Sequence, residues 1–269
     1  MSTSTSRILT SLIAGATMVA SVVHAPGAAA QLPRQEEILL PIYLRSNVIA
    51  GANGSTFGTE LVVFNRGTEH VAFGPCNEPS DPPCPPGEPV IRPNETWFNH
   101  SMGFTTAGLF GRMVHVRHEQ ADDVVFNLRA ISRASTGADE SANLPVVRTA
   151  DFKTATISLL NVPLGTERRA TLRVYDPEDR GDTRGVIVRI YTFSGDLLRE
   201  DAYRFSPSGY ASHDGYPFAP SFIQIALPDT VGADRVRVDV VPQGEGLRFW
   251  AFISLTDNRT EHVTIIAPE

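Results

Sequence analysis

Alternation of apolar and polar residues over short stretches is the feature that most constrains the fold of this chain. In the clearest stretch, residues 234–241, three valines alternate with three charged residues: Val236, Val238 and Val240 with Arg235, Arg237 and Asp239. Successive side chains of a strand point to opposite faces of its sheet, so this pattern predicts a strand with one buried face. Similar alternation occurs at residues 60–64, 172–175 and 186–193, and no window shows a convincing helical period.

Turn-forming sequences separate these stretches. They are Asn-Arg-Gly at 65–67, the acidic run at 176–182, Ser-Gly-Asp at 194–196 and the Gly-rich run at 242–246. Short strands joined by frequent turns are typical of antiparallel β-sandwiches. The sequence therefore predicts an all-β protein built from Ig-like β-sandwich domains.

Ordered matches within the chain indicate a duplicated β domain. The segment RMVHV at Arg112 is followed fourteen residues later by FNLRAIS at Phe126, as RVRVDV at Arg235 is followed by FWAFIS at Phe249. Upstream, two further pairs match in the same order: ELVVFNRG at Glu60 with TLRVYDPE at Thr171, and ILLPI at Ile38 with ISLLNVP at Ile157. The polar composition of residues 132–143 predicts a linker between the two copies. We expect a first sandwich at 31–140 and a second at 141–269.

The first thirty residues have the three parts of a secretory signal peptide. Arg7 precedes an apolar run at 8–23, and three alanines at 28–30 precede Gln31. An uncleaved anchor is the alternative, but polar residues interrupt the run, which is weakly apolar for a span of about 20 residues. We therefore expect cleavage near Gln31, a secreted or periplasmic product without a membrane span, and, from the Arg, Ala and Pro bias, a bacterial source.

The net charge of −7 gives no electrostatic basis for binding nucleic acid. Nor does the sequence contain a catalytic pattern such as a Gly-x-Ser-x-Gly elbow. We therefore expect no enzyme activity, no catalytic residue and no cofactor.

The only two cysteines, Cys76 and Cys84, lie in a proline-rich stretch, GPCNEPSDPPCPPGEPVIRP. Structural zinc requires four protein ligands, and a redox pair usually has the closer Cys-x-x-Cys spacing. Export places paired thiols in an oxidising compartment. A disulfide is therefore predicted, contributing about 2 to 3 kcal/mol at best.

Two groups of polar residues have the composition of metal sites. His115 and His118 resemble a helical zinc motif, but their flanks alternate like a strand, in which residues three apart diverge. The acidic run at 176–182 offers oxygen ligands for Ca²⁺ but lacks the closing Glu of a Ca²⁺ loop. We expect surface or strand-end histidines, a solvated hairpin loop and no metal.

Aromatic residues in the Pro- and Gly-rich segment 203–222 are the candidate ligand-binding group, with a histidine and an aspartate between them. They are Tyr203, Tyr210, His213, Asp214, Tyr216 and Phe218. Exposed rings on loops can stack on sugars or anchor a protein partner. The alternative is that they close the open end of the second sandwich. Trp250, within the strand-like FWAFIS, is expected in the core.

Four segments carry a resemblance to a known group of proteins: ELVVFNRG, TLRVYDPE, ADRVRVDV and GLRFWAFISLTDNRTEHVTIIAP. They look like uncharacterised exported bacterial proteins with two tandem β-sandwich domains. The likeness covers nearly the whole mature chain, but its motifs are strand and turn patterns, so it implies a fold and export without an activity.

The resulting expectation is a non-catalytic exported module for binding, adhesion or structure, with an unknown extracellular protein or glycan as partner. Two alternatives remain open. One is a carbohydrate-binding module that uses the aromatic loop at 203–222, and the other is a metal-dependent hydrolase built on His115 and His118.

Overall fold

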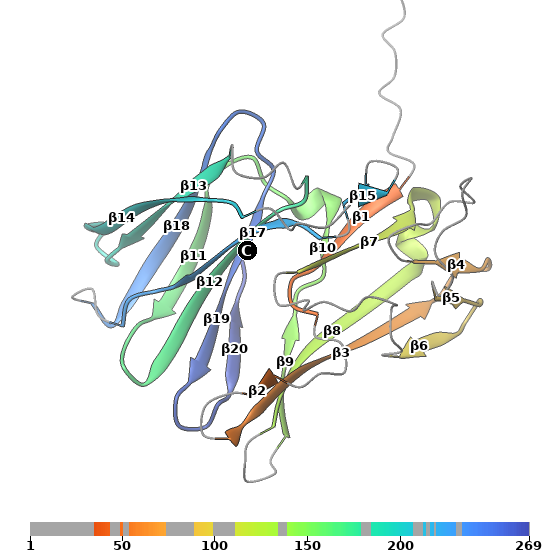
Figure 1. Ribbon diagram of the computed structural model, residues 1–269, viewed down its shortest axis with the longest axis horizontal. Helices are drawn as coiled ribbons and strands as arrows, with labels where there is room; N and C mark the ends of the chain where they lie inside the picture. Colours follow the sequence, from red (N-terminus) through yellow and green to blue (C-terminus); the bar gives the residue numbers. More distant parts are fainter. Residues whose placement is uncertain are drawn as a thin grey trace, which may run out of the picture. The chain divides into compact units, whose positions relative to one another are not determined.

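The structure, a computed structural model, describes most of the chain after residue 34 (Figure 1). The described residues are 35–43, 49–50, 54–73, 89–98, 111–133, 139–178, 184–206, 212–213, 216–217, 219–229 and 233–268. They form an all-β protein with antiparallel sheets, as predicted. The expected signal peptide, residues 1–30, and both Cys76 and Cys84 lie outside the described residues.

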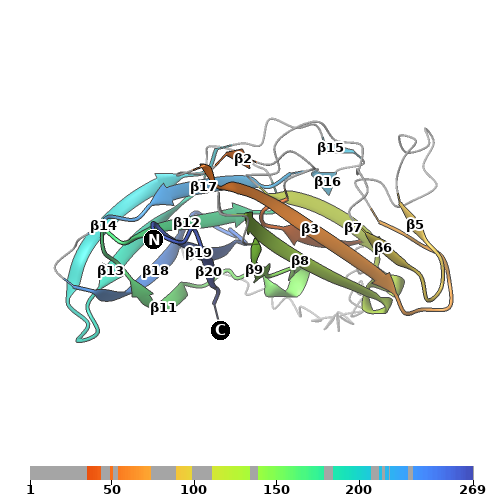
Figure 2. The ribbon, with the colours of Figure 1, turned by 90° about the horizontal axis from the view of Figure 1, so that it is seen from below.

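Strands from the first part of the chain form three sheets. The order β10-β1-β7 joins Val147–Arg148, Gln35–Leu40 and Arg112–Arg117. The order β2-β3-β8-β9 joins Ile49–Ala50, Thr56–Asn65, Val124–Arg133 and Asp139–Leu144, and β6 (Thr96–Phe98) also pairs with β3. β4 (Val71–Ala72) pairs with β5 (Val90–Ile91). Figure 2 shows β3, β8 and β9 side by side. The short 3-10 helices η2 (His118–Asp123) and η3 (Thr149–Asp151) connect strands.

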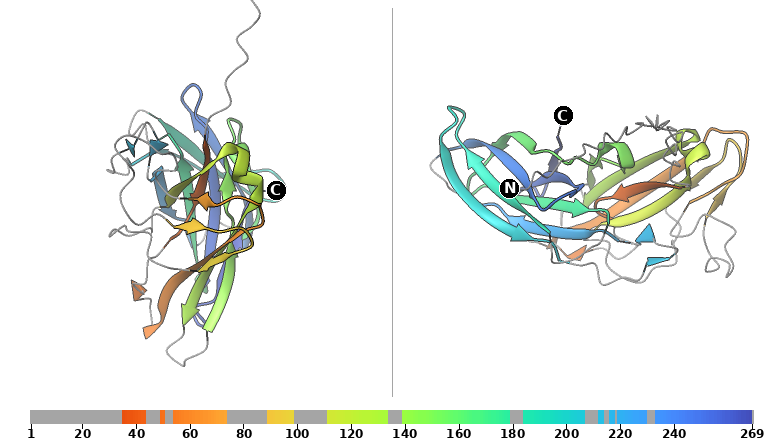
Figure 3. Two further views of the ribbon diagram at one scale, coloured as in Figure 1. Left: turned by 90° about the vertical axis from the view of Figure 1, so that its right-hand side faces the viewer. Right: turned by 90° about the horizontal axis from the view of Figure 1, so that it is seen from above.

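Strands from the second part form two four-stranded sheets, which can be followed by colour in Figure 3. One has the order β11-β18-β13-β14, which joins Ile157–Pro163, Arg235–Gln243, Gly185–Tyr191 and Leu197–Arg204. The other has the order β17-β12-β19-β20, which joins Ser221–Ala226, Arg168–Asp176, Trp250–Asp257 and Val263–Ile266. A two-stranded ribbon pairs β15 (Ser212–His213) with β16 (Tyr216–Pro217). The described residues include no helix of the length and apolar character that crossing a membrane requires.

The predicted alternation along β18 is confirmed. Val236, Val238 and Val240 are each 0% exposed and join one buried cluster. That cluster also takes Leu172 and Val174 of β12, so the two four-stranded sheets pack face to face over it. Burial of such side chains stabilises the fold by about 1.5 to 3 kcal/mol each.

A second buried cluster fills the first part of the chain and includes three aromatic residues from the second part. Tyr175, Trp250 and Phe252 belong to it, and Trp250 is 4% exposed, as expected of a core residue. The Tyr175 hydroxyl donates a hydrogen bond to the Pro41 carbonyl oxygen at 2.5 Å. Sheet β17-β12-β19-β20 is therefore covered on both faces. The domain boundary at 140 and 141 stays a prediction.

The described start of the acidic run, at the end of β12, differs from the expected solvated loop. Asp176 is 0% exposed, and its Oδ2 lies 2.9 Å from Nη2 of Arg184. The same guanidinium lies 3.1 Å from Glu178. The expectation was wrong for Asp176 because a charged side chain is buried only when it has a partner, and the sequence does not reveal that Arg184 folds back onto it.

Candidate functional site

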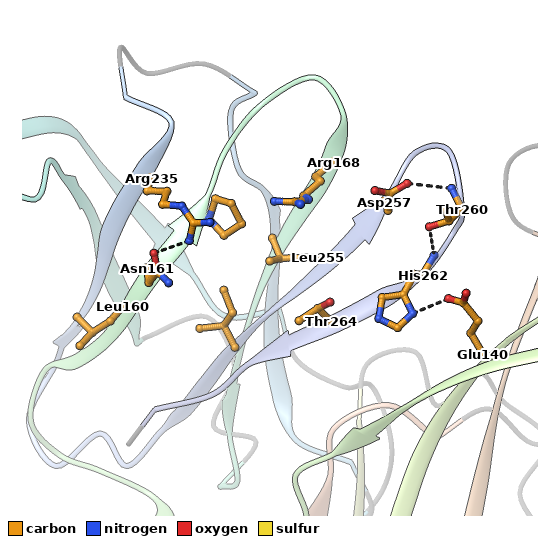
Figure 4. A pocket seen from close by; sticks show the side chains of 12 residues that line it. Glu140, Leu160, Asn161, Arg168, Arg235, Leu255, Asp257, Thr260, His262 and Thr264 are labelled. Carbon is orange, nitrogen blue, oxygen red and sulfur yellow. Dashed lines mark hydrogen bonds and ion pairs between the residues drawn. The ribbon is translucent and has the colours of Figure 1, made fainter.

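A groove with a volume of about 530 Å³ lies between β11 and β20, the terminal strands of the two sheets that pack face to face (Figure 4). β11 provides Leu160, Asn161 and Pro163. The strands β12, β18, β19, β20 and β9 and the turn after β19 supply the rest: Arg168, Arg235, Leu255, Asp257, Thr260, His262, Thr264, Ile266 and Glu140. Six strands thus bring together residues that are far apart in the sequence.

A β-bulge in β11 forms one wall of the groove. Leu159 pairs with Val238 and Val162 pairs with Val236, so two residues of β11 stand opposite one residue of β18. The extra residue lets both Leu159 and Val162 enter the core, where each is 0% exposed, although they are three positions apart. Leu160, 52% exposed, and Asn161 are left at the surface.

Asn161 combines a backbone role with a side-chain role. Its φ of 56° lies in the left-handed region, which Asn tolerates better than most residues. Its side-chain oxygen accepts a hydrogen bond from Arg235 Nη1 at 2.6 Å. The bulge therefore holds the Arg235 guanidinium at the mouth of the groove.

Arg168 lies on the opposite wall. Figure 4 shows the guanidinium groups of Arg168 and Arg235 directed toward each other across the groove. Arg168 stands opposite Asp257 in the strand register, yet in the described part of the chain neither arginine has an ion pair with a carboxylate. Two guanidinium groups that form no ion pair among the described residues make this end of the groove attractive to an anion.

The acidic residue of the lining that stands opposite Arg168, Asp257, has other hydrogen-bond partners. Asp257 Oδ1 accepts hydrogen bonds from the backbone N–H groups of Thr260 and Arg259, each at 2.9 Å. These bonds lower the pKa of Asp257, that from Thr260 most, because they favour the ionised form. The carboxylate thus orders the turn between β19 and β20 instead of pairing with Arg168.

The His262 ring and the Glu140 carboxylate lie at the other end of the groove. His262 Nδ1 lies 2.5 Å from Glu140 Oε2 of β9 (Figure 4). Both side chains are close to half exposed. The contact joins the turn between β19 and β20 to β9, in the sheet of the first part of the chain.

The described lining of the groove holds two hydroxyl groups, those of Thr260 and Thr264, and two carboxylates, those of Asp257 and Glu140, beside His262. In the residues that the structure covers, no group of three or more His, Cys, Asp or Glu side chains is placed to hold a metal ion.

Of the predicted aromatic group, the structure describes only part. Tyr203 lies in β14, where it is partly buried and packs against the cluster that contains Val236, Val238 and Val240. His213 and Tyr216 pair in the ribbon β15-β16. Tyr210, Asp214 and Phe218 lie outside the described residues, so their role as a ligand site stays a prediction.

The two histidines that resemble a zinc motif do not share a site. His115 is 0% exposed in β7, whereas His118 is exposed at the start of η2. The expectation of a surface or strand-end position is therefore wrong for His115, because the side chains on both faces of β7 are buried from Arg112 to Val116.

No protein-family profile, curated protein or solved structure matches this chain.

Proposed function

We propose that this protein is an exported, non-catalytic binding module of two tandem Ig-like β-sandwich domains, acting outside the cytoplasm on an acidic polysaccharide. The observation that carries the proposal is the pair Arg168 and Arg235, which line one groove without a carboxylate partner among the described residues. Arginine binds carboxylates through paired, charge-assisted hydrogen bonds.

The remaining lining supports a sugar chain over an extended peptide. A peptide could join the groove by pairing with the β11 edge, but the bulge at Asn161 and the ring of Pro163 interrupt that edge. A sugar ring requires hydroxyl partners and an apolar surface. Thr260 and Thr264 offer the first, and Leu160 and the partly exposed Ile266 offer the second.

The test uses polygalacturonate and its methyl-esterified form, which differ in charge. We expect affinity electrophoresis to show binding of the polyuronate and little binding of the ester. Arg168→Gln or Arg235→Gln should weaken binding roughly tenfold to a hundredfold, as the loss of a hydrogen bond to a charged group, about 1.5 to 3 kcal/mol, implies.

The matched control is Arg199→Gln, which removes the same charge from an exposed arginine of β14 outside the groove. It should leave the affinity unchanged. Equal binding of polyuronate and ester, or equal losses in Arg199→Gln and Arg168→Gln, would contradict the proposal.

A further inference from the structure

A second hollow lies on the outward face of the sheet formed by β3, β8 and β9. Its volume is about 590 Å³, and its lining is Glu60, Val62, Asn127, Arg129, Ser141 and Asn143. Glu60 and Val62 face outward because they alternate with Leu61 and Val63, both 0% exposed in the core. Figure 2 shows the three strands that carry the hollow side by side.

The strand register arranges these side chains in rows across the sheet. One row runs Phe98, Val62, Asn127 over β6, β3 and β8. The next row runs Glu60, Arg129, Asn143 over β3, β8 and β9. Side chains in neighbouring strands lie about 5 Å apart, so each row presents a continuous strip.

Charge on this face is balanced internally. Arg129 Nη1 lies 3.8 Å from Glu60 Oε1, and another nitrogen of the same guanidinium donates a hydrogen bond to the hydroxyl of Ser141. The single positive and single negative charge of the lining therefore offset each other. A ligand that complements this face carries no net charge, unlike the ligand proposed for the groove.

The uncharged members supply hydrogen bonds and a flat apolar surface. Asn127 and Asn143 are exposed amides, each with donors and an acceptor, and neither has a side-chain partner among the described residues. Phe98 is 49% exposed at the end of the first row. An exposed aromatic ring on the same face as amide groups suits a sugar, because the C–H face of the sugar stacks on the ring and its hydroxyls bond to the amides.

We propose that this face is a second binding site and that it takes a neutral polysaccharide chain. One sugar ring stacks on Phe98, and the hydroxyls of neighbouring rings along the chain bond to the two asparagines and to the Glu60 and Arg129 pair, which lie up to three strands away. The site is separate from the groove between β11 and β20, with which it shares no lining residue.

The experiment is affinity electrophoresis of the full exported chain in gels containing neutral polysaccharides, namely mannan, xylan, β-glucan and galactan. We expect at least one of them to retard the protein. Phe98→Ala and the double variant Asn127→Ala with Asn143→Ala should each lower the association constant at least tenfold. Thermal unfolding of the same variants checks that they fold.

Phe193→Ala is the matched control, because Phe193 is also an exposed phenylalanine, 69% exposed, but lies in the turn between β13 and β14. It and Arg168→Gln should leave retardation unchanged, which separates this site from the groove. The proposal is overturned if none of the four polysaccharides retards the protein, or if the face variants bind as well as Phe193→Ala. It is also overturned if Phe98→Ala converts a dimer to a monomer, because the face would then bind a second copy.

Discussion

Arg235 Nη1 lies 2.6 Å from Asn161 Oδ1, so a guanidinium on β18 is held by the bulge of β11. This contact connects a local irregularity of the backbone to the charge at the mouth of the groove. If the bulge exists to position Arg235, its backbone and its side chain can be tested separately.

Asn161→Gly keeps a residue that adopts positive φ and removes only the side-chain contact. We expect the polyuronate affinity to fall. The free energy of unfolding should stay within about 0.5 kcal/mol of the wild-type value, because Gly at a position with positive φ costs only a few tenths of a kcal/mol. Asn161→Val should destabilise the fold by about 1 to 2 kcal/mol, because a β-branched residue is strained at φ of 56°. Urea unfolding of both variants measures the difference. Equal stability of the two would show that the backbone there is not constrained.

Tyr175→Phe removes a single buried hydroxyl. The Pro41 carbonyl oxygen would lose the donor that lies 2.5 Å away, and we expect a loss of about 1 to 3 kcal/mol in the free energy of unfolding. The control is Tyr203→Phe, at a partly exposed position of β14, with a change below about 0.5 kcal/mol. Similar losses in both variants would contradict a specific role for the Pro41 contact.

Glu37 provides a pH test. Burial raises the pKa of Glu37 above 4.5, more than the neighbouring Arg248 guanidinium lowers it, and Glu178 and Asp176 raise it further. The folded state therefore disfavours the ionised form of Glu37. This lowers the free energy of unfolding when the pH is above the pKa of the folded state, and the loss disappears below pH 4.5. Glu37→Gln should accordingly raise the melting temperature at pH 7 and leave it unchanged at pH 4. A lower melting temperature at pH 7 would mean that the contact with Arg248, 3.4 Å away, outweighs burial.

Gly185 lies in β13, between β14 and β18, with no room for a side chain. A Cβ there would lie 2.2 Å from the backbone oxygen of Tyr203, so Gly185→Ala must displace β14. We expect a loss of about 1 to 3 kcal/mol in urea unfolding. Gly58 in β3 is the control, since a Cβ there meets nothing within 4 Å. Gly58→Ala should leave stability equal or higher by about 0.4 to 1 kcal/mol, and comparable losses at both glycines would disprove the steric explanation.

The sequence was sufficient for the strands whose alternation is regular. Val236, Val238 and Val240 predicted both the strand and its buried face. Alternation did not predict the buried face of β11. Leu159 and Val162 point to the same face only because the bulge inserts one extra residue between them. Asn161 followed by Val-Pro was the available signal, since Asn tolerates the left-handed conformation and Pro marks a strand edge.

The groove could not be predicted from the sequence, because its residues come from six strands and a turn, and no local sequence pattern shows how these pack together. Only the turn at Asp257 had a recognisable pattern, an Asp followed by Asn-Arg-Thr.

Asp176 shows a different limit of prediction from sequence. Its burial depends on Arg184, and nothing in the run of acidic residues distinguishes a paired carboxylate from a solvated one.

The sheet of β12 and β19 has Val174 and Ile253 on one face and Tyr175 and Phe252 on the other, so it contributes to two cores at once. Unfolding of the residues around either core would uncover one face of this sheet and expose its large apolar side chains to water. We therefore expect one cooperative transition in scanning calorimetry, with calorimetric and van't Hoff enthalpies equal.

A fragment comprising residues 31–140 alone should fail to fold cooperatively, because its core would lack the rings of Tyr175, Trp250 and Phe252. Two separate transitions would show that the halves unfold independently. One transition would mean that the two halves of the chain form a single folding unit, because they share the sheet of β12 and β19.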